Sequence, residues 1–462
     1  MKKRLWFNIH SFTGITAGLV LFVLCWSGTM ATLADEIDWL VTPELRIAEA
    51  STGVHWGRVH ATLVESTKPE WIDKLHVPMH RYAAVRAEIE PPGQPERLIY
   101  LHPRTGEKLG EFSELTIQRF FRSLHRHLFL PKPTGIVVVS LFAIALLTMA
   151  IAALMFLSRW WARFLRLRLT TRDGHVAWSD LHRTAGLWSL WFVGLMSVTG
   201  IWYGLEATGV PDGLLAPESD RVVVKQDAAA SKPLPLDTLI ARARAVRPRL
   251  EIREVEWEYH EAGSTQVRLA GQADDWLVRD RVNYVDLTVD GQVTGVGSGS
   301  DLSAYEYWVN MADPLHFGSF GGLATKLLWF VFGLLLCGLI LTGTWLHARR
   351  LARHPAGPQR LRWSATMPAC AAGLILLGLA VPFGVHEIRS YGAFAGSAEP
   401  AIGTPAGVVI FVSTWLMTTL AIIVCWLVLL WRPPRFVGEQ HRRYGDNRSR
   451  PSAAIYQDSR EY

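Results

Sequence analysis

The chain has 462 residues, half of them apolar, and it contains 20 tryptophans. Its mean hydropathy is positive, which is unusual for a water-soluble protein of this length, so the composition favours a membrane protein. The formal net charge of +6 becomes informative only once charged residues are assigned to the two sides of a bilayer. No nucleic-acid partner is expected.

The first predicted span lies within residues 1–34, where the run Ser11–Ala34 carries no charge and is long enough to cross a bilayer. Lys2, Lys3 and Arg4 precede this run, and the positive-inside rule therefore places the N-terminus in the cytoplasm. A cleaved signal peptide is the alternative interpretation. It is disfavoured because the apolar run is long and no clear small-residue cleavage site precedes Asp35.

Five further spans follow, and the basic loops between them alternate as six spans with both termini inside require. The basic loop 158–183, the loop 348–364 and the polar tail 432–462 are expected in the cytoplasm. The segments 35–132, 206–319 and 386–405 are expected in the periplasm, which makes the protein a multi-pass protein of a bacterial inner membrane. The later spans are predicted at 133–157, 184–205, 320–347, 365–385 and 406–431.

The two long external segments resemble each other in their pattern. Each has a stretch compatible with a helix, such as Leu236–Val246, followed by strands and tight turns. Thr105-Gly106 and Asp290-Gly291 carry the turn signals. The strands are predicted at Tyr82–Glu90, Arg97–Leu109, Glu251–His260, Thr265–Ala270 and Val282–Val296. The sequence therefore predicts two small α+β domains, neither of which contains a convincing catalytic triad or a phosphate-binding loop.

The first four spans contain an internal duplication. In the first and third spans a histidine precedes one glycine by four residues and a second glycine by eighteen. The second and fourth spans align through the dipeptides Leu124-His125 and Leu315-His316. The matched triplets are His10, Gly14 and Gly28 in one copy and His182, Gly186 and Gly200 in the other. The predicted fold is therefore an α-helical polytopic membrane protein, with a four-helix core built from two span–domain–span units and two extra C-terminal spans.

Eighteen residues make about five helical turns, so each histidine shares a helix face with the second glycine, roughly 27 Å away. Glycine allows close approach of a flat group, and helix bundles hold such cofactors in their cores. The pattern predicts two haems at two depths, one near His10 and His182 and the other near His125 and His316. The haems would pack against Gly14, Gly28, Gly186 and Gly200. The pairing of the axial ligands stays open.

Other interpretations of the same residues remain. A histidine at a span end can be a plain interfacial residue, and glycines can serve only helix packing. A bare copper or iron site is a further option, although a metal transporter would typically carry acidic or sulfur ligands in its spans. His347 and His127 are rival ligands. Arg122, Arg126, Arg183 and Lys326 are candidate partners for haem propionates, or simply charges that set topology.

These motifs resemble those of the PepSY-associated transmembrane proteins. The resemblance rests on His10-xxx-Gly14 and His182-xxx-Gly186, on Leu124-His125-Arg126 with Gly135, and on Leu315-His316 followed by Gly321-Gly322; Thr105-Gly106-Glu107 and Asp290-Gly291-Gln292 match in the external turns. It covers about residues 1–355 and leaves out the last two spans. It implies two haem b groups with bis-histidine ligation by the four aligned histidines. It also implies electron transfer to a ferric siderophore, or another ferric chelate, in the periplasm.

The electron donor is expected to be a quinol or a separate reductase, because no Gly-rich dinucleotide fingerprint follows a predicted strand. Two other functions are compatible with the sequence. The external domains could bind or restrain a peptidase while the spans act as an anchor in the lipid bilayer. Alternatively, the chain could transport iron, haem or a siderophore without a redox step.

Overall fold

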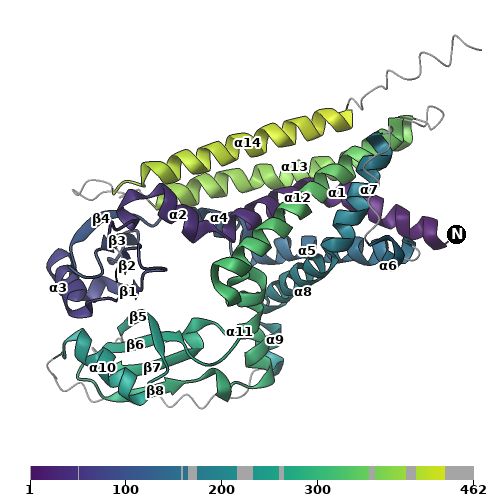
Figure 1. Ribbon diagram of the computed structural model, residues 1–462. Helices are drawn as coiled ribbons and strands as arrows, with labels where there is room; N and C mark the ends of the chain where they lie inside the picture. The colour runs from purple at the N-terminus through teal and green to yellow at the C-terminus, as the bar shows by residue number, and fades with distance from the viewer. Residues whose placement is uncertain are drawn as a thin grey trace, which may run out of the picture.

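The computed structural model describes residues 2–431 except for 50, 52, 158–159, 165–173, 216–232, 260–264, 353–358 and 392–401. Much of the basic loop expected at 158–183 and the whole tail 432–462 therefore lie outside the described residues. The molecule has two parts, a bundle of long helices and a β-sheet domain at one end of it (Figure 1). We call this end of the bundle the sheet side and the opposite end, where the N-terminus lies, the far side.

The bundle consists of long apolar helices. Five described helices are long and apolar enough to cross a membrane, and the bent pair α7–α8 makes a sixth span if it is counted as one. The chain is therefore a multi-pass membrane protein. The six are α1 (Lys2–Ala31), α5 (Thr134–Phe156), α7 (Gly174–Trp188) with α8 (Leu190–Glu206), α12 (Gly322–Ala352), α13 (Gln359–Ser390) and α14 (Ala406–Trp431).

The first span occupies the middle of the bundle. Helix α1 packs against α5, α12 and α13, and its residues from Leu19 to Leu24 are all buried. The span predicted at 184–205 is not straight, because α7 and α8 meet at Ser189 with a bend of 58°. The short helices α6 (Trp160–Arg163) and α9 (Val210–Leu215) flank the bundle.

The two external segments build one sheet rather than two separate domains. The strand order is β4-β3-β2-β1-β5-β6-β7-β8, so each segment forms a four-stranded meander and the two meanders join where β1 pairs antiparallel with β5. Glycines at positive φ turn two of the hairpins, Gly106 before β4 and Gly291 before β8, as the sequence predicts. The strands are β1 (Ile72–His76), β2 (Val85–Ile89), β3 (Arg97–Leu101), β4 (Lys108–Ser113), β5 (Glu251–Tyr259), β6 (Thr265–Gln272), β7 (Asn283–Thr288) and β8 (Val293–Gly297).

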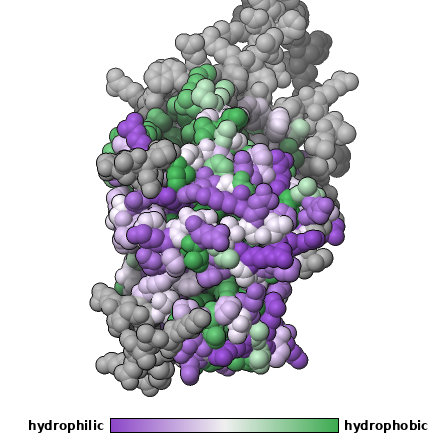
Figure 2. Space-filling view, turned by 90° about the vertical axis from the view of Figure 1, so that its left-hand side faces the viewer, coloured by the Kyte–Doolittle hydropathy of each residue, from purple (hydrophilic) through white to green (hydrophobic). Residues whose placement is uncertain are grey.

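One face of the sheet is apolar and is covered by the helices α3 (Trp56–Ser66) and α10 (Leu236–Val246). Because successive residues of a strand point to opposite faces, Leu75 and Val255 enter this core while their neighbours Lys74 and Glu256 lie on the other face. The sheet domain seen end-on has a mainly hydrophilic surface, as expected of a domain that lies outside a bilayer (Figure 2).

Three short helices connect the sheet to the bundle: α2 (Ala34–Val41), α4 (Ile117–His127) and α11 (Ala304–Phe317). The buried carboxylate of Asp38 in α2 accepts hydrogen bonds from the first two backbone N–H groups of α4, at 2.7 and 3.0 Å. Burial raises the pKa of Asp38 to about 7, against the opposite effect of these two bonds. A capping box of Ser303 and Glu306 starts α11. The two helices therefore have fixed starting points.

Charged side chains hold the seam between the two halves of the sheet. Lys74 lies 3.0 Å from Glu256, and His76 lies 2.9 Å from Glu88 and 3.3 Å from Glu254. Burial alone would lower the pKa of His76, but its hydrogen bonds with Glu254 and Glu88 outweigh burial, and the pKa is raised. The positive charge of His76 therefore stabilises the seam.

This seam makes the stability of the sheet depend on pH. Because the folded pKa of His76 exceeds the unfolded value of about 6.5, its contribution is complete below that value and is lost as the pH rises through the folded value. We expect His76→Gln to lower the melting temperature below about pH 6 and to have little effect at alkaline pH. Thermal unfolding at several pH values measures this, with the exposed His55→Gln as control. Equal destabilisation at all pH values would contradict it.

Candidate functional site

A cavity of about 550 Å³ lies within the far half of the bundle, between α1, α5, α7, α8 and α12. Its volume is in the range of pockets that hold cofactors and other small molecules. Two of the predicted ligands, His10 and His182, line it together with the predicted glycines Gly14 and Gly186. Most of the remaining wall is aliphatic, and Arg183 and Arg350 supply positive charge. The structure therefore brings the far-side residues of both sequence copies to one cavity.

Hydrogen bonds fix the proton on each of these two imidazoles. Nδ1 of His10 lies 2.9 Å from the carbonyl oxygen of Met149, which can only accept. Nδ1 of His182 lies 2.9 Å from the hydroxyl of Thr342, whose own proton is donated to the carbonyl of Gly338. Both rings must therefore donate through Nδ1, which leaves a lone pair on Nε2. Histidines that bind metals typically have this arrangement.

The rival ligand His347 lines the same cavity, but its hydrogen bonds place the proton on the other ring nitrogen. The guanidinium of Arg350 lies 3.2 Å from Nδ1 of His347, and the hydroxyl of Ser11 lies 3.0 Å from it. A guanidinium can only donate, so Nδ1 is the acceptor and the proton of the neutral ring is on Nε2. The contact favours His10 and His182 over His347 as ligands.

On the sheet side, His125 of α4 and His316 of α11 face each other. Their ring centroids are 6.0 Å apart and the ring planes are inclined by 40°. Nδ1 of His125 donates to the carbonyl of Leu24 at 2.8 Å. Nδ1 of His316 donates at 2.7 Å to the hydroxyl of Thr199, whose proton is used in a bond to the carbonyl of Leu195. The proton is again on Nδ1, and Nε2 carries the lone pair.

The distance between the two rings of this second pair would allow one metal to be held between them. A bond of about 2 Å from each imidazole nitrogen to a metal between them would put the ring centres roughly 6 Å apart, as observed. In the described part of the chain no three His, Cys, Asp or Glu side chains gather as a bare metal site would require. Two imidazoles at this distance could instead hold a haem, which would supply the remaining ligands itself.

Glycines make room for two of the four rings. A Cβ atom on Gly28 would lie 2.6 Å from Cε1 of His125, and one on Gly343 would lie 3.2 Å from Cε1 of His182. The sequence predicts a haem contact at Gly28, and the structure places the ring of His125 there. Gly200 faces the methyl group of Ala143 across the α5–α8 contact, where a Cβ would be at 3.0 Å. The cavity is therefore lined by Gly14 and Gly186 but not by Gly28 or Gly200.

The second rival ligand, His127, is buried and lies away from the His125–His316 pair. Two residues correspond to about 200° of helical rotation, so it leaves α4 on the side opposite to His125. Its Nδ1 donates to the carbonyl of Leu130 at 2.9 Å, within the turn that follows α4.

The candidate propionate partners fall into two groups. Lys326 is bound by Glu36 at 2.8 Å, and Arg183 by Asp180 at 2.8 Å. Arg122 and Arg126 are exposed on α4 beside His125, and no ion pair is made by either within the described residues. These two arginines are therefore the better placed to bind an anionic group on the sheet side.

Three residues that contact the histidines are not among those predicted from the sequence. Thr199, Thr342 and Gly343 orient or accommodate the histidines through contacts between different spans. Thr199 had one signal, since it adjoins Gly200 in the duplicated pattern. Thr342 and Gly343 occur in an ordinary apolar run, where nothing in the sequence distinguishes them.

Together these features define a class of multi-pass membrane protein that carries histidines at two levels of a helical bundle beneath an external sheet. The chain belongs to the family described as the PepSY-associated TM region, whose model matches residues 7–350. A relative from Pseudomonas aeruginosa, the uncharacterized protein PA4219, is 31% identical over an alignment of 287 residues that covers 56% of this chain and 71% of the relative. Helices α13 and α14 lie beyond the matched region.

Proposed function

We propose that this protein is a haem-containing reductase of a bacterial inner membrane. It passes electrons across the membrane to a ferric chelate, such as a ferric siderophore, and so releases Fe(II) for uptake. The single observation that carries the proposal is the common state of the four aligned histidines. Each donates through Nδ1 to an acceptor on a membrane span and keeps the lone pair of Nε2 for a metal.

In this proposal His10 and His182 hold one haem b in the far-side cavity, and His125 and His316 hold the other. The duplicated span–domain–span unit explains why each level receives one histidine from each copy. Arg122 and Arg126 are available for propionates on the sheet side, and Arg183 lines the cavity on the far side. The sheet side is the periplasm and the far side is the cytoplasm, as the basic residues Lys2, Lys3 and Arg4 at the far-side start of α1 favour.

Haems with both axial positions filled supply outer-sphere, one-electron transfer rather than oxygen chemistry when bound. The chain itself contributes the orientation of the imidazoles and an apolar surrounding that excludes water. Its sheet domain supplies the surface outside the bilayer at which a ferric chelate would be reduced. The electrons come from a quinol or a separate reductase, since the sequence has no dinucleotide fingerprint.

The decisive experiment has two stages. Purified protein is first examined by absorption spectroscopy, where the reduced Soret and α bands of six-coordinate b-type haem are expected. Dithionite-reduced protein, freed of excess dithionite, is then mixed anaerobically with a panel of ferric siderophores and with ferric citrate. We expect the α band to decay with at least one chelate.

The outcomes separate the functions that the sequence allows. A purified protein without haem would overturn the proposal and favour a membrane-anchored peptidase regulator or a transporter. Haem that no ferric chelate reoxidises would remove the reductase activity and leave haem binding in place.

A further inference from the structure

Helices α13 and α14 lie outside the family match, yet they are built into the packing of the sheet-side histidine level. Helix α13 packs along α1, and α14 contacts α2, α4 and α12. Their buried residues Ala380, Val408 and Trp415 share one core with Phe120 and Phe121 of α4, as does Tyr391 directly after α13. These two helices are therefore part of the bundle and not a separate lipid-facing appendage.

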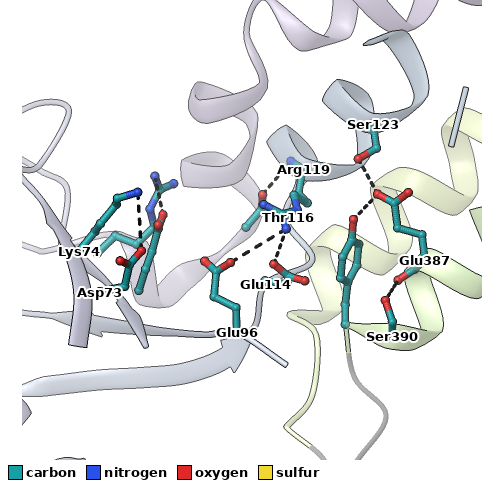
Figure 3. A network of polar contacts seen from close by, with 12 residues as sticks. Asp73, Lys74, Glu96, Glu114, Thr116, Arg119, Ser123, Glu387 and Ser390 are labelled. Atoms are coloured by element: carbon teal, nitrogen blue, oxygen red, sulfur yellow. Dashed lines mark hydrogen bonds and ion pairs between the residues drawn. The ribbon is translucent and has the colours of Figure 1, made fainter. Parts of the chain in front are cut away.

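A polar clamp connects α13 to α4 (Figure 3). The carboxylate of Glu387 accepts a hydrogen bond from the hydroxyl of Ser123 at 2.6 Å and another from Tyr391. The guanidinium of Arg119, one turn earlier on α4, lies over the ring of Tyr391 at 5.5 Å and is also paired with Glu114 at 2.6 Å. The clamp therefore holds α4 at Ser123, two residues before His125.

An aromatic wedge connects α14 to both α1 and α4. The indole of Trp415, which is 5% exposed, stacks on Trp26 of α1 with centroids 6.2 Å apart and an interplanar angle of 17°. It also makes edge-to-face contacts with two rings of α4, Phe121 at 5.0 Å and Phe120 at 6.2 Å. The ring of Trp26 is also fixed by a hydrogen bond to Thr419 of α14 at 3.1 Å.

Helices α1 and α4 together determine the position of the His125 ring. Helix α4 carries the ring, whereas α1 supplies the surface of Gly28 beneath the ring and the carbonyl of Leu24 that binds Nδ1. The position of the imidazole therefore depends on how α4 is held against α1. The wedge and the clamp act on this contact, within a few residues of Leu24, Gly28 and His125.

We infer that α13 and α14 are a brace that holds α4 against α1, with Glu387 and Trp415 as positioning residues for the His125 imidazole and hence for the sheet-side haem. This inference rests on the proposed function. The far-side haem is an internal reference, because its ligands His10 and His182 lie at the other end of the bundle.

The test compares Trp415→Ala and Glu387→Ala with the wild type. We expect both variants to lose the sheet-side haem, so that the haem content falls from two per chain to about one, or to shift its midpoint potential and electron paramagnetic resonance signal. The signals of the far-side haem stay unchanged. Glu387→Gln keeps an acceptor for Ser123, so it is expected to restore the second haem.

Two control variants remove side chains from α14 away from α4. Met417→Ala changes a side chain that is 68% exposed, and Trp426→Ala removes a buried indole that packs on Ile15 and Leu19 of α1. Both are expected to leave the sheet-side haem as in the wild type. Amide hydrogen exchange of residues 117–127 gives a readout that needs no haem, and it should become at least tenfold faster in Trp415→Ala.

The outcomes distinguish this inference from the proposed function. A wild-type protein without haem would defeat the proposed function, and hydrogen exchange alone would then decide whether the brace exists. Unchanged exchange in Trp415→Ala would overturn the brace in either case. A haem-loaded wild type whose sheet-side haem is unaffected by both alanine variants would overturn the positioning role of Glu387 and Trp415.

Discussion

Replacing His316 by alanine is expected to lower the haem content from the two per chain of the proposed function to one. The imidazole of His316 lies at a centroid distance of 6.0 Å from that of His125, so the proposed sheet-side haem would lose one of its two histidines, while His10 and His182 in the far-side cavity are unchanged. The pyridine haemochrome assay, normalised to protein concentration, measures the stoichiometry. The far-side haem should keep its spectrum.

His127→Ala and His347→Ala are matched controls for this experiment. Each removes an imidazole close to one of the two levels. His127 leaves α4 on the side opposite to His125, and His347 accepts a hydrogen bond from Arg350 through Nδ1. Both variants should retain two haems. Unchanged haem content in His316→Ala, or loss of a haem from either control, would contradict the assignment of the ligands.

Gly28→Val is expected to abolish the sheet-side haem without touching any ligand. The new Cβ would lie 2.6 Å from Cε1 of His125, so the imidazole must move away from α1 and give up its bond to the carbonyl of Leu24. Overpacking of this kind typically costs 1–3 kcal/mol. Haem content and the low-spin signal of the sheet-side haem report the change.

Gly194→Val is the control, since no atom lies within 4 Å of a Cβ built on this glycine of α8. Valine is a better helix former than glycine, so helix propensity cannot explain a loss at Gly28. A Gly28→Val protein that keeps both haems would show that the ring of His125 can be accommodated elsewhere.

The sequence predicts well those features that depend on local pattern. The uncharged run Ser11–Ala34 forms part of α1 except for its last three residues, the stretch Leu236–Val246 is the helix α10, and the hairpin at Asp290-Gly291 joins β7 to β8. The repeated spacing from His10 and His182 likewise identifies two residues that line one cavity. These signals arise from periodicity and duplication, which a single sequence contains.

Features that depend on contacts between distant segments could not be predicted. The pairing of Leu75 with Val255 joins the two expected domains into one sheet, and nothing in the sequence of either strand indicates which strand it pairs with. The proton positions on the histidines follow from acceptors such as Met149 and Thr199, which lie on other spans. The bend at Ser189 also has no signal in the sequence, and the described contacts offer no physical reason for it.

The junction between β1 and β5 has a consequence for how such a protein can be divided. If one half of the sheet were missing, β1 or β5 would become the edge strand of the remaining four-stranded half. Its unpaired backbone N–H and C=O groups could then pair with a strand of another chain. A fragment with only one four-stranded half would therefore tend to associate with itself through that strand. In the whole chain β1 and β5 pair with each other instead, so each half protects the edge strand of the other.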